Sequence, residues 1–241
     1  MEFFKEVWDI IKVDLMEVIK EFEVKGSLDW RLNCTNIILI PKCDGENSMH
    51  NFMPIILIGG VYKILSKLLA ERLKLVFPTI ILEFQGAFVG SRENTDGILI
   101  ASELIDARER ADMEGLVVKV YLEKAFNNIS WSCLDYTMVR SGKGVKQGDP
   151  ISPFIFIMVV EVLSLLIKRA ASMGLIGGFK PIYNESSCTI NHLQFADDLV
   201  VFLDDDVEQI LNLKRILLAF DLISGLKLPV SVEKKMEKIM R

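Results

Sequence analysis

The chain of 241 residues is long enough for one substantial domain, or for one domain with a smaller lobe. It has 28 lysine and arginine residues against 33 aspartate and glutamate residues, a net charge of −5, and 51% of its residues are hydrophobic. This composition excludes a disordered or collagen-like chain. An acidic balance is unusual for a nucleic-acid-binding protein but does not exclude one, because binding depends on where the basic residues lie.

The amino-terminal sequence and the cysteines favour an intracellular protein, in the nucleus or the cytoplasm. The first ten residues carry acidic side chains in place of the basic region of a secretory signal peptide. The most apolar run, residues 151–167, is interrupted by Pro153 and Glu161, so we expect a buried helix and no membrane span. The four cysteines are widely spaced and are expected to be reduced thiols.

The first half of the chain predicts helices that alternate with short strands. Two segments repeat apolar residues at steps of three and four, and a third runs from an acidic first turn to a basic end. The first helix is expected to end at Gly26, and the run 36–40, closed by Pro41, predicts a strand. A second apolar stretch follows at 55–57. The three predicted helices span residues 8–22, 62–76 and 96–110.

The second predicted helix is locally positive although the whole chain is acidic. It carries Lys63, Lys67, Arg72 and Lys74 against a single acid, Glu71. Such a face is either simply solvated or contacts a phosphate backbone, and the sequence leaves both interpretations open.

In the second half, a strand, a helix, a hairpin and a last helix follow one another. Ser152 can cap the long helix, and Pro153 suits its first turn. The hairpin turns at Ala196-Asp197-Asp198, and Gly225 stops the last helix. The strands are expected at 116–122, 192–195 and 199–202, and the helices at 152–171 and 207–223. The predicted fold class is α+β, and no linker divides the chain.

Asp197 and Asp198 are the residues of the sequence that most strongly suggest a chemical function. Adjacent carboxylates repel each other, and in isolation such a pair in a turn is usually only turn chemistry. The functional interpretation is a magnesium site, because Mg²⁺ prefers oxygen ligands. Two metal ions would need a further carboxylate from another strand.

A second candidate segment is KQGDPISP, residues 146–153. Gly148 lacks a side chain, so a substrate or a second backbone can approach closely there. Gln147 can donate and accept hydrogen bonds, and Lys146 can meet a phosphate. The alternative is a loop that merely leads into the next helix.

Eight ordered segments together resemble the reverse-transcriptase domain of non-LTR (LINE-type) retrotransposons, particularly those of plants. The resemblance spans essentially the whole chain. The segments are LIPK (39–42), NFMPIIL (51–57), YKILSKLLAERL (62–73), QGAFVGSRENTDGILIASELID (85–106), LEKAF (122–126), KQGDPISP (146–153), HLQFADD (192–198) and SGLKL (224–228).

The resemblance implies an RNA-directed DNA polymerase with right-hand fingers and palm. Residues 1–115 would be fingers-like and residues 116–241 palm-like, in one domain over 1–241. The cofactor would be two Mg²⁺ ions, and the partners an RNA template, a DNA primer and dNTPs. Asp197 and Asp198 would be catalytic and metal-binding, with Asp197 the direct ligand. The nucleotide- and template-binding residues implied are Lys42, Phe126, Lys146, Gln147 and Gly148.

The chain departs from the family pattern at the first metal-binding aspartate. That position is Tyr121, and a later aspartate of the same motif is Asn127. A phenol is neutral at pH 7 and a poor Mg²⁺ ligand. Glu123 cannot substitute, because two residues along a strand displace a side chain by about 6.6 Å. We therefore expect catalysis to fall by orders of magnitude.

The segment between residues 131 and 146 is shorter than in family members, so a part of the palm is expected to be missing. RPIS of the family reads MPII at 53–56, and no thumb segment is recognised. The sequence thus predicts a degenerate, impaired reverse transcriptase. The alternatives are a non-catalytic nucleic-acid-binding remnant and a relic without function. A phospho-acceptor site at Asp197 lacks the βαβ pattern that it would need.

Overall fold

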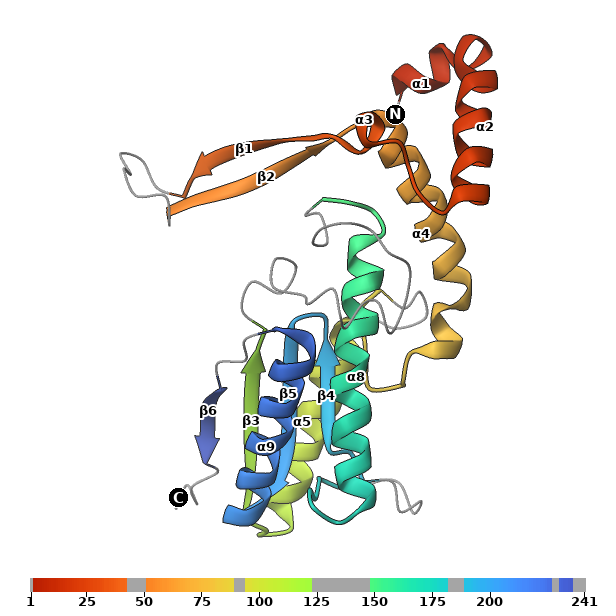
Figure 1. Cartoon of the computed structure of the whole chain (residues 1–241). Coiled ribbons are helices and arrows are strands. Elements are labelled where there is room, and N and C mark those ends of the chain that lie inside the picture. Colours follow the sequence, from red (N-terminus) through yellow and green to blue (C-terminus); the bar gives the residue numbers. More distant parts are fainter. Residues whose placement is uncertain are drawn as a thin grey trace.

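The computed structural model describes residues 2–42, 51–88, 94–122, 148–181, 189–226 and 230–235. Helices combine with antiparallel sheets, so the predicted α+β class is confirmed. Figure 1 shows a sheet with helices on both of its faces, and above it a separate β-hairpin with the amino-terminal helices. Within the described ranges no helix is long and apolar enough to cross a membrane.

The first half contains the predicted helices and the predicted strand, with two short helices in addition. Gly26 ends the first long helix with a φ of +65°, as its sequence position indicates. The elements are α1 (Glu2–Glu6), α2 (Trp8–Lys25), α3 (Trp30–Asn33), β1 (Thr35–Pro41), β2 (Phe52–Ile58), α4 (Gly60–Ile80) and α5 (Asn94–Arg110).

The second half contains β3 (Gly115–Tyr121), α8 (Ser152–Ser172), β4 (His192–Phe195), β5 (Asp198–Asp204), α9 (Val207–Ser224) and β6 (Val230–Lys235). The predicted cap at Ser152 is wrong. Ser152 is the first residue of α8, which begins after Ile151 without a side-chain capping bond. Pro153 does lie in the first turn, and Gly225 ends α9 with a φ of +71°.

Four strands form the larger sheet in the order β4-β5-β3-β6, and all of its pairs are antiparallel. Its two buried faces follow from the strand sequences. In β3, Val118 and Val120 lie on the face that α8 and α9 cover. Val117 lies on the opposite face, packed against a cluster that contains Leu104 of α5 and Phe202 of β5. Alternation along the strand thus separates the two layers.

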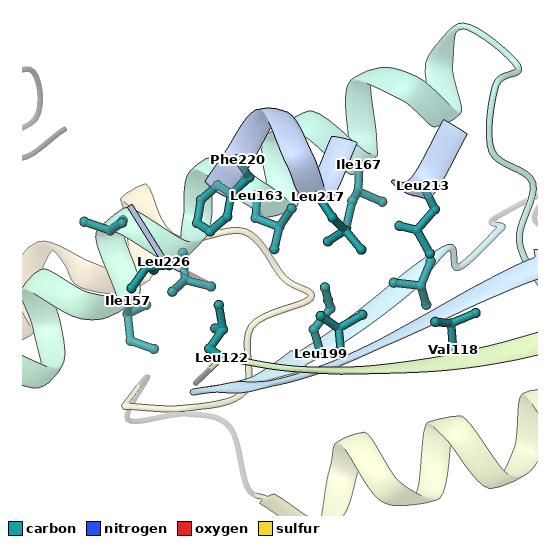
Figure 2. Close-up of a cluster of buried hydrophobic side chains, with 14 of the residues drawn as sticks. Val118, Leu122, Ile157, Leu163, Ile167, Leu199, Leu213, Leu217, Phe220 and Leu226 are labelled. Carbon is teal, nitrogen blue, oxygen red and sulfur yellow. The ribbon is translucent and has the colours of Figure 1, made fainter. Parts of the chain in front are cut away.

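The main core lies between this sheet and helices α8 and α9. Figure 2 shows side chains of both helices pointing at the strands. Leu163, Phe220 and Leu199 are fully buried there. Burial of a side chain of this size stabilises the fold by about 1.5–3 kcal/mol. The apolar run 151–167 therefore forms a core helix, as predicted.

Candidate active site

The acidic pair lies at the turn between β4 and β5. Phe195 pairs with Asp198, so Ala196 and Asp197 are the two central residues of a tight hairpin. Ala196 has a φ of +53° and Asp197 does not have a positive φ, the combination found in a type II′ turn. The Asp197 side chain is exposed and Asp198 is half-buried. The predicted hairpin is confirmed, and its second strand begins one residue earlier than expected.

Backbone and side-chain hydrogen bonds hold this turn from three directions. The Ala196 amide donates to Oε1 of Gln85 at 3.2 Å. The Ala196 carbonyl accepts from Nε2 of Gln194 at 3.4 Å, and the Asp197 carbonyl accepts from the Leu122 amide at 3.2 Å. The backbone that carries the carboxylates is therefore fixed by groups of β4, the end of β3 and the segment after α4.

Gln85 is a residue that the sequence reasoning did not select as part of the site. It is fully buried, and its Oε1 also accepts from the Ala87 amide at 2.9 Å. The amide of Gly86 donates to the Gln194 carbonyl at 2.8 Å, which aligns this segment beside β4. A Cβ at Gly86 would come within 3.3 Å of the Phe195 ring. The sequence feature that could have indicated this role is the Gln-Gly pair at the start of the QGAFVG segment.

Tyr121 lies directly opposite Asp198 in the β3–β5 ladder. Because the next pair along, Leu122 and Asp197, is hydrogen-bonded, Tyr121 and Asp198 form a non-hydrogen-bonded pair, in which the Cα atoms lie about 4.5 Å apart. Both side chains therefore belong to the same face of the sheet. Nζ of Lys119 lies 4.5 Å from the centre of the Tyr121 ring. A phenol and an ammonium group thus border the acidic pair.

The side chains that the structure describes around this turn do not fit a centre with two Mg²⁺ ions. Among the described residues, no group of three histidine, cysteine or acidic side chains could hold a metal ion. Asp197 and Asp198 supply two carboxylates, and the neighbouring position on β3 supplies a neutral phenol. Hard cations need several oxygen ligands with negative charge, so the pair alone is an incomplete set.

Gly148 and Asp149 lie at the junction of α4 with the start of α8. The buried Asp149 carboxylate accepts hydrogen bonds from the Tyr62 hydroxyl at 2.8 Å and from the Ser66 hydroxyl. Burial, followed by the negative charge of Asp149, raises the pKa of Tyr62. Gly148 has a φ of +85° and lines a pocket of about 160 Å³ together with Lys63.

Of the remaining predicted site residues, the structure describes Lys42 alone, and it does not bring Lys42 to the acidic turn. Lys42 follows β1 and is exposed, and its amide donates to the Asn51 carbonyl at 2.8 Å. Figure 1 shows that end of the β1–β2 hairpin projecting away from the four-stranded sheet. Phe126, Lys146 and Gln147 lie outside the described residues.

The chain thus combines an antiparallel sheet, an acidic turn between two of its strands, and helices on both faces of the sheet. A comparison with protein families gives a clear match. Residues 40–237 match the family described as reverse transcriptase (RNA-dependent DNA polymerase), so the chain belongs to the reverse transcriptase family. Its relatives identify it as a reverse-transcriptase domain of the non-LTR retrotransposon type.

Two of these relatives are transposon proteins. The chain is 24% identical over 242 residues to the transposon TX1 uncharacterized 149 kDa protein of Xenopus laevis, covering 86% of this chain and 18% of that protein. It is 28% identical over 208 residues to the retrovirus-related Pol polyprotein from type-1 retrotransposable element R2 of Popillia japonica, covering 70% of this chain and 27% of that protein.

A third relative is the uncharacterized mitochondrial protein AtMg01250 of Arabidopsis thaliana. It is 46% identical over 61 residues, which are 25% of this chain and 48% of that protein. Each match thus spans less than half the length of the relative concerned.

Proposed function

We propose that this chain is a retrotransposon-derived reverse-transcriptase domain whose nucleotide-polymerising activity is strongly reduced or lost. The observation that carries the proposal is the pairing of Tyr121 with Asp198. By resemblance, this position belongs to the carboxylate that completes the metal set with Asp197. Loss of one charged ligand removes several kcal/mol of transition-state stabilisation, and about 1.4 kcal/mol corresponds to a tenfold change in rate.

The proposed division is a fingers-like part over residues 1–115 and a palm-like part over residues 116–241. The palm-like part would be shortened between residues 131 and 146. The alignment with the TX1 protein has 242 positions but covers only 86% of the 241 residues of this chain, so some positions are gaps in this chain. These gaps support a shortened chain. The same holds for the R2 protein, with 208 positions over 70% of the chain. Both relatives therefore have residues without a counterpart here.

Primer extension on an RNA template, with Mg²⁺ and with Mn²⁺, tests the proposal. We expect activity orders of magnitude below that of a complete reverse transcriptase, and no further decrease in Asp197→Ala. Tyr121→Asp restores the missing carboxylate and should raise any residual synthesis, whereas the matched Tyr121→Phe should not. Processive synthesis by the unaltered chain that disappears in Asp197→Ala would contradict the proposal.

A second candidate function is binding of nucleic acid without catalysis. Lys63, Lys67 and Lys74 are all exposed on α4. At about 100° per residue, these three lysines lie within roughly 40° of one another, and Arg72 lies on the opposite side of the helix. The structure thus separates Arg72 from the basic group in which the sequence placed it. The lysine stripe begins beside the pocket that Gly148 lines.

The salt dependence of binding to an RNA–DNA primer–template tests this second function. Replacing the three lysines by alanine should weaken binding, because fewer phosphate groups of the nucleic acid are then neutralised. The slope of log K against log salt should fall by about 1 for each phosphate group that no longer has a lysine beside it. Arg72→Ala is the matched control and should leave the slope unchanged. Absence of salt-sensitive binding by the unaltered chain at low salt would exclude this function.

A further inference from the structure

The acidic turn is bonded to the rest of the fold through its two central residues. A two-residue hairpin turn leaves the N–H and C=O groups of these residues outside the strand ladder. Here the Ala196 amide donates to Gln85, and the Ala196 carbonyl accepts from Gln194. The Asp197 carbonyl accepts from the Leu122 amide. Water can bond such groups in an exposed turn, so bonds to protein groups at these three positions are a specific feature of this fold.

These bonds set the direction in which the Asp197 side chain leaves the backbone. A peptide unit is planar, so a bond to its carbonyl orients the whole unit. Gln194 orients the unit that precedes the Asp197 Cα, and Leu122 orients the unit that follows it. Together the two units determine φ and ψ of Asp197 and therefore its Cα–Cβ direction. Only rotation about the side-chain bonds then remains for the carboxylate.

The Gln194 side chain is in turn oriented by helix α8. Its Nε2 donates to the Ala196 carbonyl at 3.4 Å, and its Oε1 accepts from the Ser164 hydroxyl at 2.8 Å. A carbonyl oxygen can only accept, so Nε2 must face the turn and Oε1 must face Ser164. Gln194 and Ser164 are both buried. The core helix α8 thus acts on the acidic turn through one buried amide.

Gln85 acts on the same turn from the neighbouring segment. It lies opposite Gln194 in a parallel bridge. The Gln194 amide donates to the Phe84 carbonyl at 2.9 Å, and the Gly86 amide donates to the Gln194 carbonyl at 2.8 Å. Gln85 accepts from the Ala196 amide, whereas Gln194 donates to the Ala196 carbonyl. Because a buried polar group that loses its partner is costly, the two glutamines form a rigid support for the turn.

We propose that Gln85, Gln194 and Ser164 are positioning residues, which keep Asp197 oriented for binding a divalent cation although position 121 lacks a carboxylate. At this turn, the disagreement with a metal centre then lies in the number of ligands and not in the backbone geometry. The inference rests on the proposed function, because that function makes Asp197 a residue of the metal site.

The affinity for Mn²⁺ tests the proposal without any need for polymerase activity. Mn²⁺ prefers carboxylate oxygens, as Mg²⁺ does, and electron paramagnetic resonance measures its free concentration. Tyr121→Asp adds a carboxylate directly opposite Asp198. We expect this variant to bind Mn²⁺ at least tenfold more tightly than the unaltered chain does. Asp197→Ala in the Tyr121→Asp background should abolish the gain, which shows that the ion is bound at the turn.

Ser164→Ala in the Tyr121→Asp background removes the hydroxyl that orients Gln194. It should weaken Mn²⁺ binding by about threefold to tenfold, the equivalent of one hydrogen bond. Gln85→Met in the same background should have an effect of similar size. Ser224→Ala is the matched control, because Ser224 is an equally buried serine whose hydroxyl donates to the Phe220 carbonyl within α9. It should leave the Mn²⁺ affinity unchanged.

Circular dichroism establishes that each compared variant is folded, and Ser164→Ala is the mildest of these changes. Failure of folded Tyr121→Asp to bind Mn²⁺ more tightly than the unaltered chain would overturn the proposal. Unchanged affinity after Ser164→Ala, or an equal loss after Ser224→Ala, would also overturn it. The proposed function fails by a different result, because polymerisation by the unaltered chain contradicts that function whatever the effect of Ser164→Ala on Mn²⁺ affinity.

Discussion

Ala196 adopts a backbone conformation that L-amino acids rarely occupy. Its φ is +53°, a value that is unfavourable for a residue with a Cβ and that glycine adopts readily. Ala196 immediately precedes Asp197. Hydrogen bonds from Gln194 and Leu122 to the turn, and from the Ala196 amide to Gln85, hold the turn in this state. Strain at a site that would hold reactive groups is common in enzymes, and the surrounding structure must compensate for it.

Substitutions at Ala196 should reveal this strain. Ala196→Val should destabilise the protein by about 1–3 kcal/mol, because a β-branched side chain tolerates a positive φ poorly. Ala196→Gly relieves the strain but adds freedom to the unfolded chain, so its net effect should lie within about 1 kcal/mol of zero. Urea unfolding measures both. Equal destabilisation by the two variants would contradict a strained turn.

The buried His192 predicts a pH dependence of stability. Burial, followed by the positive charge of Lys168, lowers the pKa of His192 to about 4 from 6.5. Between these values the unfolded chain binds a proton that the folded chain does not, so stability is complete above pH 6.5 and falls as the pH drops toward 4. Unfolding curves at several pH values should show this decrease, and His192→Gln should remove most of it.

At the scale of elements, most helices and strands follow from the sequence because each has one apolar face. The prediction did not include β6, since VSVEKK has only two apolar residues, and its place is set by pairing with β3. α1 and α3 are too short for periodicity to reveal. The acidic turn was predictable from two short strands, but Gln85 was not, because its contact with Ala196 joins residues 111 positions apart.

The Asp149 contacts join two elements and should be important for stability. Asp149 accepts from Tyr62 and Ser66 of α4, and it lies just before α8. Tyr62→Phe removes one hydrogen bond to a charged acceptor and should cost about 1.5–3 kcal/mol. Chemical denaturation measures the difference. An unchanged free energy of unfolding in Tyr62→Phe would argue against a specific α4–α8 link.

At the scale of the whole molecule, burial is unevenly distributed. Leu15 is the single buried residue of α2, and α1 has none. In contrast, β3, β5, α8 and α9 share one continuous apolar core. Most of the apolar burial that stabilises the fold therefore lies in the four-stranded sheet and its helices.

Hydrogen exchange should show this division directly. Amides of β3, β5 and α8 should exchange slowly and together, because their opening requires unfolding of the shared core. Amides of α1 and α2 should exchange much faster. Mass spectrometry of peptides after deuterium labelling measures both groups. Uniformly fast exchange, including in β3 and α8, would instead favour a relic that does not fold stably.

Tyrosine and aspartate codons differ only in their first base, so a single point mutation separates the side chain at position 121 from a carboxylate. Tyr121 is 37% exposed and is held by the backbone ladder of β3, so the exchange requires no change in the core. The shortening that we propose between residues 131 and 146 could be reversed only by an insertion. The two proposed departures from the family pattern thus differ in how easily mutation can reverse them: one needs a single base change, and the other needs recombination with an intact copy.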